Sequence, residues 1–230
     1  MPSGPGYPMT SLRLRYQTLE LEGIDIHLST LWDTAQFEDD DGAAAAVGIC
    51  AASWPLFGVV WASGRVLANL MVDFDVAHKR VLEIGCGIAL ASLVLQHRAA
   101  DITATDHHPA VGVFLARNVA LNGGPAIPFV RTGWDEPDCG MGRFDLIIGS
   151  DLLYERDHAA SLSAFIERHA RPSCDIVIVD PGRGSGGRFS RLMVDLGFTA
   201  GRGVPAPVDN VAPGYGGQIL VYSRHPAALT

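Results

Sequence analysis

The sequence predicts a doubly wound α/β domain with a mostly parallel sheet and a short extension at its N-terminal end. From Arg80 onward, short and nearly wholly apolar segments alternate with amphipathic segments of helix length. This alternation is typical of βαβ units, in which helices join parallel strands. The strand-like segments carry few polar residues, as expected of strands whose two faces are both covered by helices. A chain of 230 residues is long enough to bury such a core without disulfides or metals.

The individual elements follow from the spacing of apolar residues. Six short apolar segments are predicted as strands, at residues 80–84, 101–106, 126–131, 144–150, 175–180 and 217–223. The segments between them have helical spacing, which predicts helices at residues 89–97, 109–122, 160–170 and 186–196.

The first part of the chain has a different pattern. We expect residues 1–62 to form an extension that packs, as a lid or an added edge, on a main domain at residues 63–230. A helix should begin at Ser63-Gly64. Apolar and polar residues alternate on both sides of Glu22-Gly23, which predicts a β-hairpin. The extension is therefore expected to contain a loose tail, this hairpin and an acidic loop, at residues 1–10, 12–28 and 30–41.

Charge and hydropathy exclude several kinds of partner. The formal net charge is −8, so the basic surface used in general nucleic-acid binding is not expected. A local basic groove stays open, because four arginines gather in one half of the chain: Arg143, Arg156, Arg168 and Arg171. No apolar run reaches the roughly 18 residues of a membrane-spanning helix. The N-terminal residues also lack the pattern of a signal peptide, so no membrane contact is expected.

The cysteines indicate the cellular compartment. They are far apart and form no CxxC pair: Cys50, Cys86, Cys139 and Cys174. This spacing argues against a zinc ribbon or a disulfide framework and suits a reducing compartment. A cytoplasmic location is therefore expected.

Candidate ligand-binding residues follow the first two predicted strands of the main domain. Gly85 and Gly87 allow a tight turn and a close approach of the backbone to a ligand. Asp106 ends the next strand, where a carboxylate can accept both ribose hydroxyls of an adenosine. Ligands of open α/β sheets bind beyond the carboxyl ends of the strands, so these residues should meet at one site.

Three interpretations of this turn remain at this point. A glycine turn followed by a distant acid describes an S-adenosylmethionine (SAM) site, a dinucleotide site or a purely structural turn. Glu83 favours the first, because it lies two residues before Gly85, where a pyrophosphate would meet a buried negative charge. A carboxylate there instead suits the ammonium group of SAM.

Several longer motifs resemble those of known methyltransferases. LEIGCGIALAS at residues 82–92 is similar to motif I of the class I methyltransferases, and TDHHP is similar to their following strand. Further stretches resemble family 16 of these enzymes, the protein lysine methyltransferase group: GVVWASGRVLANLM, RTGWDEP, SDLLY and DPGR. The last motif, DPGR, resembles the branch of this family that methylates the β subunit of electron transfer flavoprotein. The resemblance runs from Gly58 to Asp195, with Ala89 in place of a third glycine and no known substrate signature near the C-terminal end.

This resemblance implies a Rossmann-like class I fold with seven strands, SAM as cofactor and a set of site residues. The implied catalytic residues are Asp151 and Tyr154. The implied cofactor-binding residues are Trp61, Glu83, Gly85, Cys86, Gly87, Asp106, His107, Trp134, Asp135 and Ser150. No metal site is expected, because the neighbouring side chains of His107 and His108 diverge and no acidic or cysteine cluster accompanies them.

Each of the more specific residues also has a structural interpretation. Trp61 would serve as a core anchor, Asp151 as the N-cap of the next helix, and Tyr154 as a packing residue. The segment Asp180-Pro181-Gly182 would be only a turn after a strand. Trp134 lies in a polar turn, which favours contact with an adenine ring.

The sequence therefore predicts an enzyme, a SAM-dependent methyltransferase, with three possible functions. The first is methylation of a protein lysine, in which Asp151 orients the amine or acts as a general base and the Tyr154 ring contacts the positive charge. The second is N- or O-methylation of a small molecule, since the fold serves many substrates. The third is SAM binding without catalysis.

Overall fold

The computed structural model describes residues 12–36, 39, 41–137, 140–154, 158–182, 184–201 and 213–225. Two of the sequence predictions, the loose tail at residues 1–10 and the position of Cys139, lie outside these residues. The same is true of residues 202–212.

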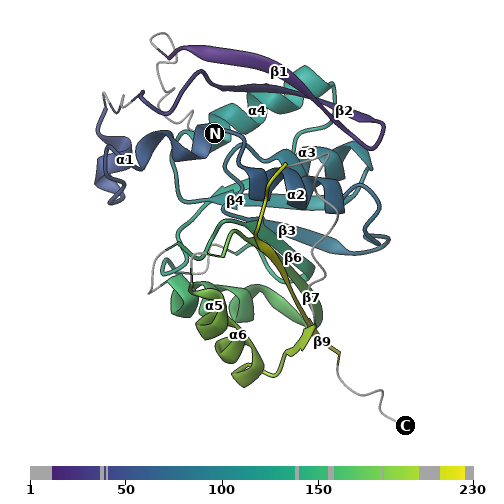
Figure 1. The fold of residues 1–230 in the computed structure, drawn as a ribbon. Helices are drawn as coiled ribbons and strands as arrows, with labels where there is room; N and C mark the ends of the chain where they lie inside the picture. Colours follow the sequence, from purple (N-terminus) through teal and green to yellow (C-terminus); the bar gives the residue numbers. More distant parts are fainter. Residues whose placement is uncertain are drawn as a thin grey trace.

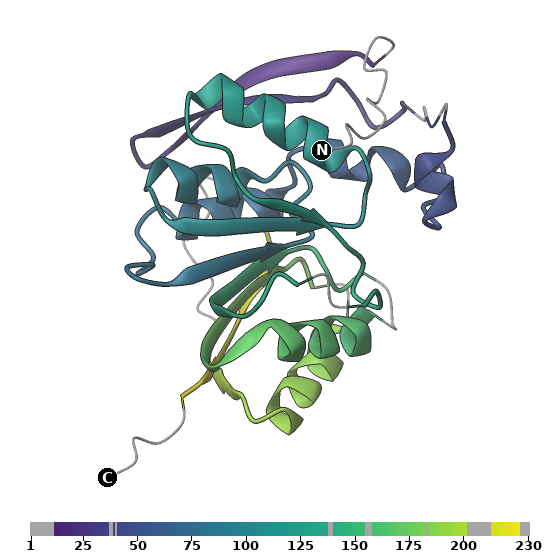
Figure 2. The same cartoon turned by 180° about the vertical axis from the view of Figure 1, so that it is seen from behind.

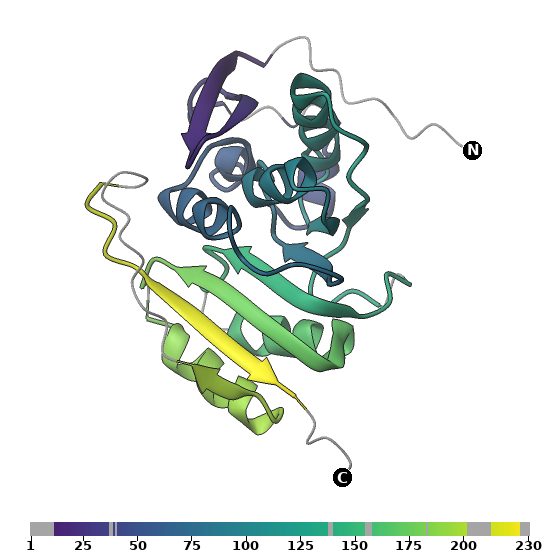
Figure 3. The ribbon, with the colours of Figure 1, turned by 90° about the vertical axis from the view of Figure 1, so that its right-hand side faces the viewer.

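The main domain is built on one seven-stranded sheet (Figure 1). The strand order is β5-β4-β3-β6-β7-β9-β8, and β9 runs antiparallel to both of its neighbours, as Figure 3 shows for β7 and β9. The other pairs from β5 to β7 are parallel. The predicted doubly wound, mostly parallel sheet is therefore confirmed. The strands are β3 (Arg80–Ile84), β4 (Asp101–Asp106), β5 (Phe129–Arg131), β6 (Phe144–Ser150), β7 (Ala170–Asp180), β8 (Thr199–Gly201) and β9 (Gln218–Arg224).

Helices cover both faces of this sheet (Figure 1). The helices are α2 (Ala62–Leu70), α3 (Leu90–His97), α4 (Val111–Asn122), α5 (His158–His169) and α6 (Gly186–Asp195). Side chains alternate between the faces along each strand, so Val81 joins the apolar cluster with α2, α3 and α4, whereas Leu82 joins the cluster with α5 and α6. The core therefore consists of two apolar layers separated by the sheet.

The predicted hairpin is present as β1 (Leu14–Leu21) and β2 (Ile24–Leu31). It forms a two-stranded sheet of its own, so it does not extend the edge of the main sheet. It lies over α4 (Figure 2), where Asn118 Oδ1 accepts a hydrogen bond of 2.8 Å from the backbone N–H of Ser29. The proposed division of the chain at residue 62 stays a prediction.

Some predicted boundaries were wrong. Strand β2 includes Thr30 and Leu31, which were expected in the loop, because both are buried against the domain. Strand β5 is shorter than expected, since Pro128 has no N–H for the ladder. Strand β8 was missed because its three residues are all exposed and show no apolar pattern. Two short helices were also missed, α1 (Ala43–Ala46) and the 3-10 helix η1 (Trp54–Gly58).

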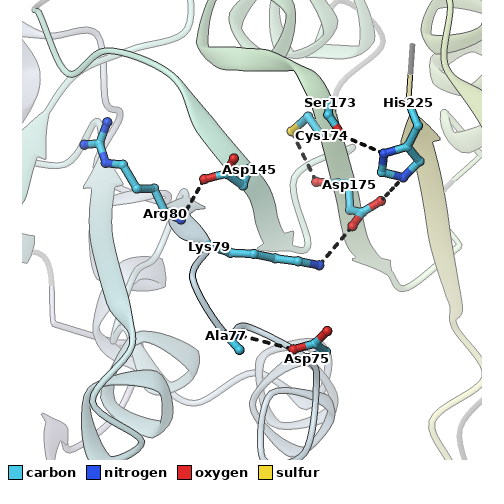
Figure 4. A network of polar contacts seen from close by, with 9 residues as sticks. All are labelled: Asp75, Ala77, Lys79, Arg80, Asp145, Ser173, Cys174, Asp175 and His225. Atoms are coloured by element: carbon cyan, nitrogen blue, oxygen red, sulfur yellow. Dashed lines mark hydrogen bonds and ion pairs between the residues drawn. The ribbon is translucent and has the colours of Figure 1, made fainter. Parts of the chain in front are cut away.

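A polar network joins the strands at the edge where β3, β6 and β7 begin (Figure 4). The Asp175 carboxylate lies 3.1 Å from Lys79 Nζ and 3.1 Å from His225 Nε2. The Asp145 carboxylate accepts a hydrogen bond of 2.9 Å from the backbone N–H of Arg80. These contacts fix the start of β3 on the side of the sheet away from the glycine turn.

In the part of the chain that the structure describes, no helix has both the length and the apolar character needed to cross a membrane.

We expect Asn118→Ala to lower the free energy of unfolding by about 1–3 kcal/mol, because the buried N–H of Ser29 loses its acceptor. Asn122→Ala is the matched control, since Asn122 bonds the exposed His27 backbone, which water can solvate instead. Urea denaturation followed by circular dichroism gives both values. Equal losses for the two variants would contradict the assigned role of Asn118.

Candidate cofactor and acceptor site

The turn after β3 is the centre of the site. Gly85 and Gly87 have φ angles of +58° and +52°, in the left-handed region that favours glycine. A Cβ at Gly85 would lie 2.6 Å from the Leu152 side chain, and one at Gly87 would lie 3.1 Å from the Phe57 carbonyl oxygen. Both glycines are therefore required by backbone conformation and by close neighbours.

Asp106 ties this turn to the end of β4. Its Oδ2 accepts a hydrogen bond of 2.8 Å from Gly87 N–H, and its Oδ1 accepts one of 2.8 Å from His108 N–H. Burial raises the pKa of this carboxyl group above its usual value, against the lowering effect of these two bonds. Each carboxylate oxygen has a second lone pair, so Asp106 can still accept hydrogen bonds from ribose hydroxyls.

Glu83 is buried beneath the turn and faces the start of α3. Its Oε2 accepts hydrogen bonds from Ser92, from the backbone N–H at 2.9 Å and from the hydroxyl group. Burial raises the pKa of Glu83 to about 7, and the bonds to Ser92 oppose that shift. A cationic ligand group near Glu83 would stabilise its ionised form.

An aromatic cluster from η1 covers the glycine turn, and sequence reasoning missed it. The ring of Phe57 stacks on the ring of His108 at 4.1 Å, and Trp54 meets the same ring edge-on at 5.6 Å. Burial lowers the pKa of His108 to about 4, so its imidazole is neutral at physiological pH. Its Nδ1 accepts a hydrogen bond from Ala110 N–H.

The two adjacent histidines point to different partners. His107 Nε2 lies 2.8 Å from the Val47 carbonyl oxygen, whereas His108 packs into the aromatic cluster. Within the described residues, no group of three or more histidine, cysteine or acidic side chains is arranged to hold a metal ion.

Trp61 lies at the N-cap position of α2, and its side chain is exposed. Its ring N–H donates a hydrogen bond of 2.8 Å to the Leu56 carbonyl oxygen. This bond holds the Trp61 ring at the rim of the site. The interpretation of Trp61 as a core anchor is wrong, because its side chain is exposed. The tryptophan in the core is Trp54, which is 1% exposed.

Asp151 follows β6 directly, in the left-handed conformation with φ of +55°. Its backbone N–H donates a hydrogen bond of 2.9 Å to the Val179 carbonyl oxygen, which fixes the residue beside the end of β7. The interpretation of Asp151 as a helix N-cap is wrong, because Leu152, Leu153 and Tyr154 are not helical. Aspartate adopts this conformation more readily than most residues other than glycine.

Trp134 and Tyr154 meet through a shared neighbour. The ring of His158 lies edge-on to Trp134 at 5.1 Å and edge-on to Tyr154 at 4.5 Å. Tyr154 is 54% exposed, so it is not a buried packing residue. Trp134 is partly buried, and its carbonyl oxygen accepts a hydrogen bond from Arg168.

The remaining predicted residues lie at different depths. Cys86 is buried, and burial together with Asp106 and Glu83 raises the pKa of its thiol well above the usual value. Ser150 ends β6 under α2, where a Cβ at Gly64 would lie 3.6 Å from its hydroxyl oxygen. Asp135 is exposed, in the turn that follows β5.

Together these residues occupy the carboxyl edge of the sheet, where the chain order reverses between β3 and β6. Glu83, Gly85, Gly87 and Asp106 lie together on the β3–β4 side, and Asp151 lies on the β6–β7 side. Open α/β sheets bind ligands at such a reversal point. The arrangement suits one ligand that spans β4 to β6, with a second reactant beyond it.

Comparison with known proteins assigns the family. A model described as lysine methyltransferase matches residues 55–186, which is more than half of the chain. This chain belongs to the lysine methyltransferase family. It is 29% identical over 133 residues to the mouse electron transfer flavoprotein β subunit lysine methyltransferase, covering 56% of this chain and 51% of that protein. It is also 29% identical over 153 residues to the zebrafish protein N-lysine methyltransferase METTL21A, covering 62% of this chain and 69% of that protein. The chain thus spans about half the length of the mouse relative.

Solved structures share the fold. A putative SAM-dependent methyltransferase from Streptococcus mutans matches with a TM-score of 0.65 at 11% identity, over 96% of this chain and 57% of that one. The magnesium protoporphyrin IX methyltransferase from Synechocystis, with bound SAM, matches with a TM-score of 0.55 at 20% identity, over 71% of this chain and 78% of that one. With the family match, these likenesses confirm the predicted class, a SAM-dependent methyltransferase domain of class I fold.

We expect Asp106→Ala to weaken SAM binding by roughly tenfold to a hundredfold, because charged hydrogen bonds to the ribose are lost. The structure adds a second effect: the N–H groups of Gly87 and His108 lose their acceptor, so the melting temperature should also fall. Asp101→Ala is the control, since Asp101 starts the same strand but is largely exposed, and calorimetry should show unchanged SAM affinity. Normal SAM affinity in Asp106→Ala would assign ribose recognition to another residue.

SAM affinity should rise as the pH increases from about 6 to about 7.5, below the range in which an α-ammonium group loses its proton. Burial raises the pKa of Glu83 from its ordinary value of 4.5 to about 7 in the folded protein without SAM, so the folded chain binds more protons than the unfolded chain between these two pH values. Folding stability due to Glu83 therefore falls as the pH rises from 4.5 to 7. A SAM ammonium group bound near Glu83 would favour its ionised form, so we expect binding to release a proton there.

Calorimetry in buffers of different ionisation enthalpy measures that proton release. Glu83→Gln should flatten the pH dependence of SAM affinity, whereas Asp145→Asn at the opposite edge of the sheet should leave it unchanged. An unchanged pH profile in Glu83→Gln would exclude an ionic role for Glu83 in SAM binding.

Proposed function

We propose that this chain uses SAM to methylate the amine of a lysine side chain in a protein. The observation that carries the proposal is the position of Asp151, which directly follows β6 and is bonded to Val179 of β7, in a chain of the lysine methyltransferase family. The alternative function, methylation of a small molecule, stays as an outcome of the experiment below.

The residues around the turn fit SAM. Glycines 85 and 87 allow the tight left-handed turn that brings the backbone close to a ligand, Asp106 offers lone pairs to ribose hydroxyls, and Glu83 provides a carboxylate for an ammonium group. Trp61 and Trp134 supply aromatic surface at the rim for the remainder of the ligand. When bound, SAM supplies a methyl group that is already activated by its positive sulfur.

The task of the protein is then to align an uncharged amine with that methyl group. The ammonium first loses a proton to water, and the nitrogen lone pair then forms the new bond to carbon while the carbon–sulfur electron pair stays on sulfur. Positive charge thus moves to the acceptor nitrogen. A carboxylate fixed beside that nitrogen, as we propose for Asp151, interacts more strongly in the transition state than in the ground state. The exposed ring of Tyr154 would contact the methylammonium product through its face.

The choice of a protein lysine rests on the relatives. Proteins named as lysine methyltransferases of electron transfer flavoprotein β subunit and as METTL21A are among them. A Xenopus relative, 30% identical over 103 residues, is named histone-arginine methyltransferase METTL23, so arginine is the competing acceptor. We propose a cytoplasmic location from the scattered cysteines.

The deciding experiment incubates the purified protein with tritiated SAM and a cell lysate. A labelled protein band whose acid hydrolysate contains methyl-lysine supports the proposal. Methyl-arginine in the hydrolysate would show that the acceptor is arginine and not lysine. A labelled low-mass product alone would favour the small-molecule alternative. SAM binding with no transfer to either fraction would favour a non-catalytic protein.

Asp151→Asn should slow methyl transfer by about a hundredfold or more while leaving SAM affinity within about threefold, because the carboxylate acts mainly in the transition state. Asparagine tolerates the left-handed conformation, so the melting temperature should stay near that of the wild type. Asp151→Gly should relieve the positive φ and preserve or raise the melting temperature, yet lose transfer equally.

These two variants separate catalysis from folding better than Asp151→Ala, which would add backbone strain. Asp101→Asn is the surface control and should transfer methyl groups normally. Near-normal transfer by Asp151→Asn, measured on the labelled lysate protein, would remove Asp151 from the mechanism.

A further inference from the structure

The residues just before β9 return to the carboxyl edge of the sheet. Since β9 is antiparallel to β7, Gln218 at its start pairs with Asp180 at the end of β7. Asp151 is bonded to Val179, the neighbour of Asp180. The segment from residue 213 to residue 217 therefore lies next to Asp151, although about sixty residues separate them in the sequence.

Tyr215 lies in this segment, and its ring closely approaches Gly217. A Cβ at Gly217 would collide with the phenolic oxygen of Tyr215 and would lie 2.5 Å from the Asp180 carbonyl oxygen. The Tyr215 ring packs against the apolar layer that contains Val179 and Ile219. Gly217 thus allows the ring to fold back over the junction of β7 and β9.

The polar atoms at this junction are incompletely bonded. Among the described residues, no partner lies within hydrogen-bond distance of the buried Tyr215 hydroxyl. Asp180 is only 1% exposed; its Oδ2 accepts a hydrogen bond of 3.1 Å from Gln218, while its Oδ1 has no partner in the described part of the chain. Buried polar groups are normally hydrogen-bonded, so two neighbouring exceptions indicate a place that a ligand completes.

The charges around Tyr215 fix its protonation state. Burial, followed by the negative charges of Asp180 and Asp151, raises the pKa of Tyr215 to about 12. The phenol therefore remains neutral at physiological pH. It can accept a hydrogen bond from an N–H group through its oxygen, but it does not remove a proton from the amine.

We propose that Tyr215 positions the methyl acceptor, its hydroxyl oxygen accepting a hydrogen bond from the acceptor amine on the β7–β9 side while Asp151 holds the amine from the β6 side. The buried carboxylate of Asp180 adds negative charge next to this position, which suits a nitrogen that becomes cationic during transfer. The inference rests on the proposed function, because it requires an amine acceptor. The family match ends at residue 186, so Tyr215 belongs to a part of the chain that the match does not cover.

The main test is Tyr215→Phe. We expect the rate of tritium transfer from SAM to the lysate protein to fall by about fivefold to twentyfold, with SAM affinity within twofold, because one hydrogen bond to the acceptor is lost. The melting temperature should stay unchanged or rise, since the variant removes a buried hydroxyl that lacks a partner in the free protein. If Tyr215 were purely structural, Tyr215→Phe would lower the melting temperature and leave the transfer rate unchanged.

Tyr222→Phe is the matched control. Tyr222 is a buried tyrosine of β9 whose hydroxyl lies 2.7 Å from the Ser190 hydroxyl on the α6 side of the sheet. Its substitution should lower the melting temperature and leave the transfer rate per folded molecule within about twofold.

A second variant displaces the ring without removing it. Gly217→Ala should reduce transfer at least as much as Tyr215→Phe. The double variant should be little slower than Gly217→Ala alone, because both changes remove the same contact. Additive losses in the double variant would contradict a shared role.

A binding measurement keeps this test separate from the proposed function. n-Butylammonium, which reproduces the end of a lysine side chain, is titrated by NMR into the complex with S-adenosylhomocysteine. We expect Tyr215→Phe to weaken its binding severalfold and Tyr222→Phe to leave it unchanged. If the wild type methylates only a small molecule, the lysine proposal fails. Tyr215→Phe should still lower the rate of methyl transfer to that small molecule. Wild-type transfer rate and n-butylammonium affinity in Tyr215→Phe would overturn the inference.

Discussion

The carboxylate of Asp106 is the interaction on which the rest of the cofactor side depends. By accepting one hydrogen bond from Gly87 and one from His108, it joins the turn after β3 to the segment after β4. The ring of His108 in turn supports Phe57, and the Phe57 carbonyl lies over Gly87. One buried carboxylate therefore positions both the floor of the site and the aromatic cover from η1.

The two sides of the site are built in different ways. The cofactor side consists of a local turn, its anchoring acid and a nearby helix start, all within a short stretch of sequence. The acceptor side combines the ends of β6 and β7 with residues before β9, which reach it only through antiparallel pairing. A family can therefore keep the first side constant while the second side changes with the substrate.

This difference explains what could be predicted from the sequence. The strands from β3 to β7 and the glycine turn have strong local patterns, so the fold was predicted correctly and candidate cofactor residues could be named, which stay a prediction. Strand β8 was missed because it is short and exposed, and η1 was missed because its role depends on packing against His108. Trp61 and Trp54 could not be ranked by burial, since both lie in similar apolar surroundings along the chain. The contribution of Tyr215 depends on strand pairing and on Gly217, neither of which has a local signature.

The network at the opposite edge of the sheet has a practical consequence. Lys79 is the only lysine among these 230 residues, and it is paired with Asp175 far from the glycine turn. These residues thus carry no lysine near the proposed transfer site. Methyl-lysine found in a reaction mixture can accordingly be attributed to the partner protein rather than to self-modification within these residues. Amine-reactive dyes would likewise attach to these residues at one side chain, which leaves the carboxyl edge of the sheet unaltered for binding measurements.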